Sequence, residues 1–170
     1  NEIIENRVDL GLAFALPKHN DLHQIAISHF KLGAIVSTEH PLASQKTVSF
    51  HQCLDYDVIM PKPNLSIYQQ LAPLFAGEQH AIPNFKMQTS SLELMKQLIL
   101  RNKGIGFQTF FGLENEIINN RLRYIPLNDN NGIYCDLGLY ARKGHYLSTA
   151  TDALSRLITD EILQRGEAGQ

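Results

Sequence analysis

The side chains best suited to chemistry in this chain are short hydroxyl and amide groups that follow predicted strands. Ser66-Ile67-Tyr68-Gln69 and Ser90-Ser91-Leu92-Glu93 each place a serine three residues before Gln or Glu, which is the spacing of a helix capping box. A helix N-terminus presents free N–H groups and a partial positive charge, so it favours a carboxylate or a phosphate. These segments therefore indicate non-covalent binding of a small polar or anionic molecule.

Further polar residues would lie beside these serines if the strands are parallel. Pro63 and Asn64 precede the first helix, Thr89 precedes the second, and Gln108 with Thr109 ends the next predicted strand. In open α/β sheets, ligands bind beyond the carboxyl ends of the strands. A capping box alone more often does no more than start a helix. A binding site is favoured because three such loops are expected to meet at the same edge of the sheet.

Catalytic and metal-binding interpretations have little support. His51-Gln52-Cys53 places a base and a nucleophile two residues apart, a spacing that rarely gives a catalytic pair or a metal site. Asp55-Tyr56-Asp57 precedes a strand and is typical of a solvated turn. Gly104-Ile105-Gly106 lacks the third glycine and the strand-before-helix order of a dinucleotide loop. We therefore expect no enzymatic activity, no metal and no cofactor.

Composition indicates an ordinary globular chain that does not bind nucleic acid by itself. The 170 residues are 44% hydrophobic and 19% charged, and 15 Lys and Arg against 17 Asp and Glu give a net charge of −2. Binding to phosphate backbones requires a basic surface. Cys53 and Cys135 favour buried thiols in a reducing compartment, with a single disulfide as the alternative. A cytoplasmic location is therefore expected.

The chain has the features of a fragment of a longer protein. It opens at Asn1 without a methionine, and residues 2–6 have the character of the end of a helix. It has no signal peptide. No apolar run approaches the ~18 residues that a membrane span requires.

Long extended segments occupy the first and last thirds of the chain. Residues 8–14 and 134–142 are each expected to form a strand, and 23–37 has apolar residues roughly two apart. Residues 149–164 are expected to form an amphipathic helix. Its inward side chains are expected to be Leu154, Leu157, Ile158 and Ile162.

The middle of the chain alternates strands and helices, which is typical of an α/β domain with a largely parallel sheet. Strands are expected at 57–60, 85–88, 105–108 and 122–125, and helices at 66–75, 92–101 and 113–119, with Gly104 as a helix C-terminal glycine. If 23–37 and 134–142 both cross between lobes, the lobes are 1–37 plus 138–170, and 38–137. Small ligands bind in the clefts of such architectures.

The chain as a whole resembles the effector-binding, or regulatory, domain of LysR-type transcriptional regulators. Five motifs in the family's order carry this resemblance: Val8-Asp9-Leu10-Gly11-Leu12-Ala13-Phe14, His40-Pro41-Leu42-Ala43, the segment 94–106 ending in Asn102-Lys103-Gly104-Ile105-Gly106, Arg121-Leu122-Arg123-Tyr124-Ile125-Pro126-Leu127, and the strand 136–142 with the final helix. Each motif alone is weak, and the five together cover nearly all of the chain.

The resemblance implies a two-lobed α/β fold similar to type 2 periplasmic binding proteins, with mostly parallel sheets and two crossing hinge strands. It also implies that the family's N-terminal winged helix-turn-helix, linker helix and the first strand and helix of lobe one precede Asn1. DNA would be bound only through that N-terminal domain. Homodimers or tetramers would form through the regulatory domains, and no membrane is involved.

The family's pattern also implies where effector contacts lie. By position they are Phe14, Ala15, Pro63, Asn64, Ser66, Thr89, Ser90, Ser91, Gln108 and Thr109. Many members end the last of these strands with a proline, whereas this chain continues as Phe107-Gln108-Thr109-Phe110-Phe111.

The leading hypothesis is therefore a co-inducer-binding domain that senses a small polar or anionic metabolite in the cleft between its lobes. The alternative is a solute-binding protein of a transporter with the same two-lobed fold. A small α/β enzyme ranks last, because no acid–base or nucleophile pair converges on the expected rim.

Overall fold

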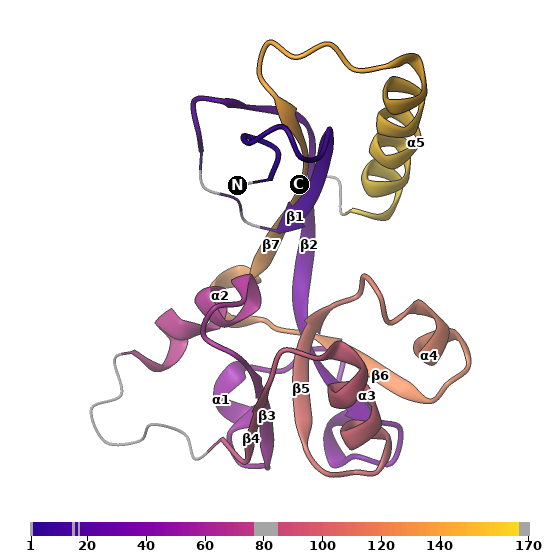
Figure 1. Cartoon of the computed structure of the whole chain (residues 1–170). Helices are drawn as coiled ribbons and strands as arrows, with labels where there is room; N and C mark the ends of the chain where they lie inside the picture. The colour runs from indigo at the N-terminus through magenta and orange to yellow at the C-terminus, as the bar shows by residue number, and fades with distance from the viewer. Residues whose placement is uncertain (1, 15, 17, 77–84, 167–170) are drawn as a thin grey trace. The chain divides into compact units, whose positions relative to one another are not determined.

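The protein divides into two compact units in a computed structural model that describes residues 2–14, 16, 18–76 and 85–166 (Figure 1). Unit 1 comprises Asn1–Phe30 and Cys135–Gln170, and unit 2 comprises Lys31–Tyr134. The chain changes unit twice, once inside a long strand and once at the start of the last strand. The expected lobe boundaries at residues 37 and 138 lie further along these same two strands.

The predicted helices and strands occur in the expected order, and the structure adds α1 and two 3-10 turns that the sequence did not predict. The strands are β1 (Leu10–Phe14), β2 (Leu22–Ser37), β3 (Val58–Pro61), β4 (Met87–Thr89), β5 (Ile105–Thr109), β6 (Leu122–Pro126) and β7 (Tyr134–Arg142). The helices are α1 (Phe50–Cys53), α2 (Ser66–Phe75), α3 (Leu92–Leu100), α4 (Glu114–Ile118) and α5 (Thr149–Arg165), with 3-10 turns η1 (Pro41–Ser44) and η2 (Asp129–Asn131).

Strand directions correct one expectation. Of the pairs with a described register, β1 with β7, β2 with β5 and β2 with β6 are antiparallel, whereas β3 pairs parallel with β4 and with β5. Mostly parallel sheets were expected, but among the strand pairs with a described register only β3–β4 and β3–β5, the strands joined through α2 and α3, are parallel; an isolated parallel bridge also joins Val48 to Leu127. A helical crossover returns the chain in the same direction, whereas the other described pairs join strands that run oppositely.

Unit 1 is built from β1, β7, the first half of β2 and α5. β1 and β7 are paired in the register Leu12 to Leu139. The rings of Phe14 and Phe30 meet edge to face with their centroids 6.3 Å apart, which joins β1 to β2 through their side chains.

The buried face of α5 differs from the face expected from the sequence. Ile162 is 2% exposed and Ser155 is 4% exposed, whereas Leu154 is 51% and Leu157 is 68% exposed. Seven residues apart, Ser155 and Ile162 lie two turns apart on one face of the helix, whereas Leu154 lies about 100° round from Ser155 and Leu157 lies nearly opposite it. The inward placement expected for Leu154 and Leu157 is therefore wrong. A small serine takes the central inward position, so the helix contributes fewer leucines to the core.

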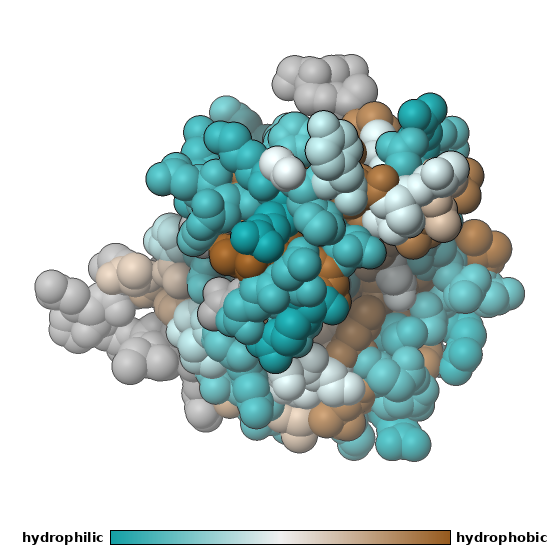
Figure 2. Space-filling view, turned by 45° about the horizontal axis from the view of Figure 1, so that its top comes forward, coloured by the Kyte–Doolittle hydropathy of each residue, from teal (hydrophilic) through white to brown (hydrophobic). Residues whose placement is uncertain are grey.

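Unit 2 has a dense hydrophobic core. Ile35, Ile59, Ile99, Leu113 and Leu122 form a buried cluster with Met95. The face of the molecule drawn in Figure 2 is largely hydrophilic, with hydrophobic side chains in small patches between polar ones. Most of the large apolar side chains described in unit 2 are buried, and their removal from water is the main favourable contribution to its folding.

The turn from α3 into β5 depends on an asparagine and a glycine. Asn102 adopts a positive φ of 54°, and the Lys103 N–H donates to the Leu98 carbonyl, so Asn102 ends the helix in the left-handed conformation. Gly104, expected to have that role, has φ +143° and lies against the backbone of Asp57. A Cβ at Gly104 would be 2.5 Å from the Asp57 carbonyl oxygen.

Gly104→Ala is expected to lower the free energy of unfolding by about 3 kcal/mol, because it combines an unfavourable φ with a clash against backbone. Gly144 is the matched control: its φ is +73°, but nothing lies within 4 Å of its added Cβ, so Gly144→Ala should cost about 1 kcal/mol. Urea unfolding followed by circular dichroism measures both. Equal losses would show that contact with Asp57 does not constrain this turn.

Candidate effector-binding site

The three parallel strands of unit 2 end at one edge of the sheet. β3 lies between β5 and β4, and Pro61 at the end of β3 is opposite Thr89 at the end of β4. The Lys62 N–H continues this pairing by donating to the Thr89 carbonyl at 3.2 Å. α2 begins five residues beyond β3 and α3 begins three residues beyond β4, so the loops that open both helices lie at this edge.

A small pocket of about 60 Å³ opens at this edge. Four of the residues expected as ligand contacts line it: Thr89, Ser90, Ser91 and Gln108. The remaining lining is apolar and consists of Pro61, Leu65, Ile67, Leu92, Met95 and Phe107. An apolar wall with a few polar groups is the usual composition of a small-molecule site.

The other expected contacts lie elsewhere. Pro63 and Asn64 are exposed, Ser66 is half-buried, and none of the three lines the pocket, whereas their neighbours Leu65 and Ile67 do. Thr109 is 1% exposed and also does not line it. Phe14 is half-buried in β1 of unit 1, and Ala15 lies outside the described residues.

The Thr89-Ser90-Ser91 turn leaves the middle hydroxyl without a hydrogen bond to a described residue. The Thr89 Oγ1 accepts from the Ser91 N–H at 3.0 Å, and the Ser91 Oγ accepts from the Leu94 N–H at 3.2 Å. Ser90 is exposed and lines the pocket. The two flanking side chains thus hold the backbone of the turn, and the Ser90 hydroxyl is free to donate to a ligand.

The predicted capping boxes at the starts of α2 and α3 are absent, so both predictions are wrong. The N-cap of α3 is Ser91, one residue later than expected, and the N-cap of α2 is Leu65, which makes no side-chain capping bond. The hydrogen bond from the Ser91 N–H to Thr89 shifts the start of α3, because it fixes a turn over residues 89–91. A complete capping box occurs instead at Ser49 and Gln52, where α1 begins.

Gln108 and Thr109 end β5 with two unused polar groups. The Thr109 N–H donates to the Gln108 Oε1 at 2.9 Å, which fixes the amide and leaves its NH₂ group free of described partners. The Thr109 hydroxyl is buried and has no hydrogen-bond partner among the described residues. A buried hydroxyl without a partner costs about 1–3 kcal/mol. The end of β5 thus carries two polar groups that no described residue satisfies.

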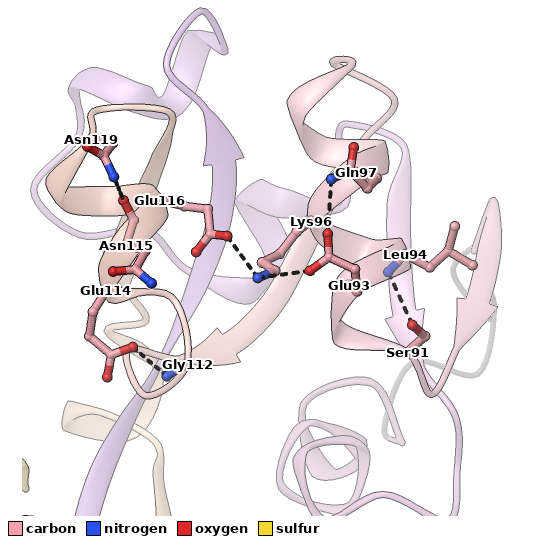
Figure 3. A network of polar contacts seen from close by, with 10 residues as sticks. All are labelled: Ser91, Glu93, Leu94, Lys96, Gln97, Gly112, Glu114, Asn115, Glu116 and Asn119. Carbon is pink, nitrogen blue, oxygen red and sulfur yellow. Dashed lines mark hydrogen bonds and ion pairs between the residues drawn. The ribbon is translucent and has the colours of Figure 1, made fainter.

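An ion-pair network joins α3 to α4 (Figure 3). The Lys96 Nζ donates to the Glu116 Oε1 at 2.8 Å and lies 3.0 Å from the Glu93 Oε2. The side chains of Lys96 and Glu116 are only 14% and 17% exposed. The Gly112 N–H, in the loop after β5, donates to the Glu114 carboxylate at 2.8 Å. Both helices that follow pocket strands are thus held to each other through charged groups.

The network shifts the pKa values of its members. The hydrogen bond from Lys96 lowers the pKa of Glu116, and the bond to Glu116 raises the pKa of Lys96. Hydrogen bonds from Gln97 first and Lys96 second lower the pKa of Glu93. The sequence contained the charges but no signal for the long-range partner, because α3 and α4 are separated by β5.

The cysteines and the glycine motif have structural explanations. Burial raises the pKa of the Cys53 thiol to about 12, with a smaller effect from Asp129, and burial raises that of Cys135 to about 12. Both cysteines are therefore protonated thiols at neutral pH, whereas an activated cysteine nucleophile has a lowered pKa. Gly106 lets α3 approach β5, since an added Cβ would lie 2.6 Å from the Met95 Sδ.

Other site types also find little support within the part of the chain that the structure describes. No group of three or more His, Cys, Asp or Glu side chains there is placed to hold a metal ion. No described helix is both long enough and apolar enough to cross a membrane. Asp57, from the acidic turn noted in the sequence, forms an ion pair with Lys86.

Glu116→Gln is expected to lower the free energy of unfolding by about 1 kcal/mol at pH 7. Because the hydrogen bond from Lys96 holds the folded-state pKa of Glu116 below its usual value of about 4.3, the stabilisation is complete above that value and is lost as the pH falls through the folded pKa. Urea unfolding at pH 7 and at successively lower pH should show the difference from the unmodified chain narrowing below about pH 4.

Glu5→Gln, which removes an exposed ion pair with Arg7, is the control and should change stability little at either pH. A loss at Glu116→Gln that stays constant down to pH 3 or so would contradict the assignment to its charge.

Comparison with known proteins shows the family. A family model described as the LysR substrate binding domain matches residues 1–162. The hydrogen peroxide-inducible genes activator of Haemophilus influenzae is 22% identical over 156 residues, covering 92% of this chain and 51% of that protein. The chain therefore spans about half the length of the curated relative it matches.

Solved structures show the same fold. The effector-binding domain of QuiR in complex with shikimate is similar with a TM-score of 0.73 and 17% identity, over 97% of this chain and 77% of that one. The CcmR regulatory domain of Synechocystis PCC6803 in complex with 2-PG has a TM-score of 0.75 and 19% identity, over 96% and 78%. The resemblance and the α/β fold expected from the sequence are confirmed, and the chain belongs to the LysR substrate binding domain family.

Proposed function

We propose that this chain is the effector-binding domain of a LysR-type transcriptional regulator and that it senses a small polar or anionic metabolite. The observation that carries the proposal is the pocket at the ends of the parallel strands. There the free Ser90 hydroxyl and the free Gln108 amide lie beside an apolar wall. A ligand with a polar head group and a short carbon skeleton fits such a lining.

Each polar group has a distinct role in this proposal. Ser90 donates a hydrogen bond to the effector, and the Gln108 NH₂ group sets the effector's orientation from the end of β5. Thr89 and Ser91 keep the turn in shape. The N-terminus of α3 adds a partial positive charge, which favours a carboxylate or phosphate group on the ligand.

Binding changes an equilibrium and involves no chemical step. An effector that binds one arrangement of the regulator more tightly than another shifts the population towards it by that difference in affinity. In the whole regulator, DNA contacts belong to a domain outside this chain, and copies assemble into homodimers or tetramers in the cytoplasm. The curated relative, itself named as an activator of genes, favours this proposal over a transporter's solute-binding protein with the same fold.

A thermal-shift screen of the full-length regulator identifies the effector class. The panel contains shikimate, 2-PG, aromatic acids, other organic acids and amino acids. A compound at 100 times its dissociation constant adds about 2.7 kcal/mol of stability. The best compound then serves as the probe for the variants below.

Ser90→Ala is expected to weaken binding of that compound about 10-fold, because one hydrogen bond to a charged or polar group is lost. Its unfolding free energy and its DNA binding without effector should be unchanged. Ser91→Ala is the neighbouring comparison: it removes the cap of α3 and should cost about 1 kcal/mol of stability. A Ser90→Ala protein that binds the compound with unchanged affinity would exclude Ser90 from the site.

A further inference from the structure

A second pocket is formed by residues of unit 1 alone. It has a volume of about 390 Å³ and is formed where β2 begins, where β7 ends and where α5 starts. Four of its lining residues are basic or can become so: His23, Arg142, Lys143 and His145. None of these four residues takes part in the proposed effector site.

The basic side chains of this pocket are free of acidic partners. His23, Arg142, Lys143 and His145 are exposed, and none is hydrogen-bonded or ion-paired through its side chain to a residue that the structure describes. Elsewhere in unit 1, by contrast, cations such as Arg7 and Arg156 are paired with carboxylates. The pocket therefore concentrates unneutralised positive charge in a chain whose net charge is −2.

The backbone fixes where this charge is presented. The Lys143 N–H donates to the Asp21 carbonyl at 2.8 Å, which joins the end of β7 to the start of β2. Gly144 then turns with φ +73°, and the His145 N–H returns to the Arg142 carbonyl. This tight turn directs Arg142, Lys143 and His145 around one hollow.

The acidic and hydroxyl groups at the pocket do not cancel the charge. Asp152 lines it, but its carboxylate forms an ion pair with Arg156 at 2.9 Å. Ser155 is buried and donates to the Asp152 carbonyl at 2.8 Å. The first turn of α5, which Ser148 caps, adds the partial positive charge of a helix N-terminus on the same side.

We propose that this pocket is a second ligand site of the chain and that it binds a small, doubly charged oxyanion through Arg142 and Lys143. A phosphate group or a pair of carboxylates carries the charge, and the planar fork of the Arg142 guanidinium matches either one with two parallel hydrogen bonds. Lys143 supplies a second, flexible positive charge from the adjacent position. This site is independent of the candidate effector pocket lined by Thr89, Ser90, Ser91 and Gln108, which belongs to unit 2.

The test titrates the whole 170-residue chain with inorganic phosphate and, separately, with malonate, by calorimetry and by amide shifts in NMR. Arg142→Gln with Lys143→Gln should weaken binding about 10-fold, because two charge-assisted contacts are lost. Arg7→Gln with Lys18→Gln removes the same charge from unit 1 outside the pocket and should leave binding unchanged. Both double variants alter exposed side chains only, and their thermal unfolding is compared with that of the unmodified chain.

Binding of phosphate alone would identify a phosphorylated ligand class, and binding of malonate alone would identify a dicarboxylate class. In either case the shifts must centre on the amides of Gly144 and His145. Absence of binding by both anions, or equal weakening in the two double variants, would overturn the proposal. Ser90→Ala should leave anion binding intact, so failure of this site and failure of the effector proposal give different results.

Discussion

The parallel pairing of β3 with both β4 and β5 is the constraint on which the candidate site depends. Parallel neighbours must end at the same edge, and each crossover helix must start there. Turn residues separated by about twenty positions in sequence thereby meet at one pocket, as Thr89 and Gln108 do. Antiparallel β2 then closes the other side of β5, with Leu32 opposite Thr109, and buries the end of that strand.

This constraint explains which parts of the site were accessible from sequence. Strand and helix order follows from apolar periodicity, so the rim and the Thr89–Ser91 turn were predictable. The exact N-cap of α3 was not predictable. The hydrogen bond from the Ser91 N–H to the Thr89 Oγ1 fixes a turn over residues 89–91, and the helix starts one residue later than the sequence spacing indicates. Leu65 and Ile67 were missed for a similar reason: their apolar types are typical of any helix start, and only the packed structure places them at a pocket.

Packing decided the remaining differences. The apolar pattern of α5 suggested a leucine face, yet Ser155 occupies the inward position because tertiary contacts outweigh a weak amphipathic signal. Gly104 was expected to end α3 as its C-terminal glycine, whereas Gly104 and Gly106 instead lack the Cβ atoms that would clash with Asp57 and Met95. The basic pocket of unit 1 gave no sequence signal, since His23 and Arg142 are far apart in the chain and join only through strand pairing.

Mapping of the bound effector by NMR tests whether Ser90 and Gln108 bind it. The isotope-labelled 170-residue chain is titrated with shikimate and with the most stabilising compound of the thermal-shift panel. We expect the largest amide changes at Ser90, Ser91 and Gln108, and we expect the midpoint of the titration to move to about 10-fold higher ligand concentration in Ser90→Ala. An unchanged midpoint in Ser90→Ala, or changes confined to residues that do not line this pocket, would contradict the assignment.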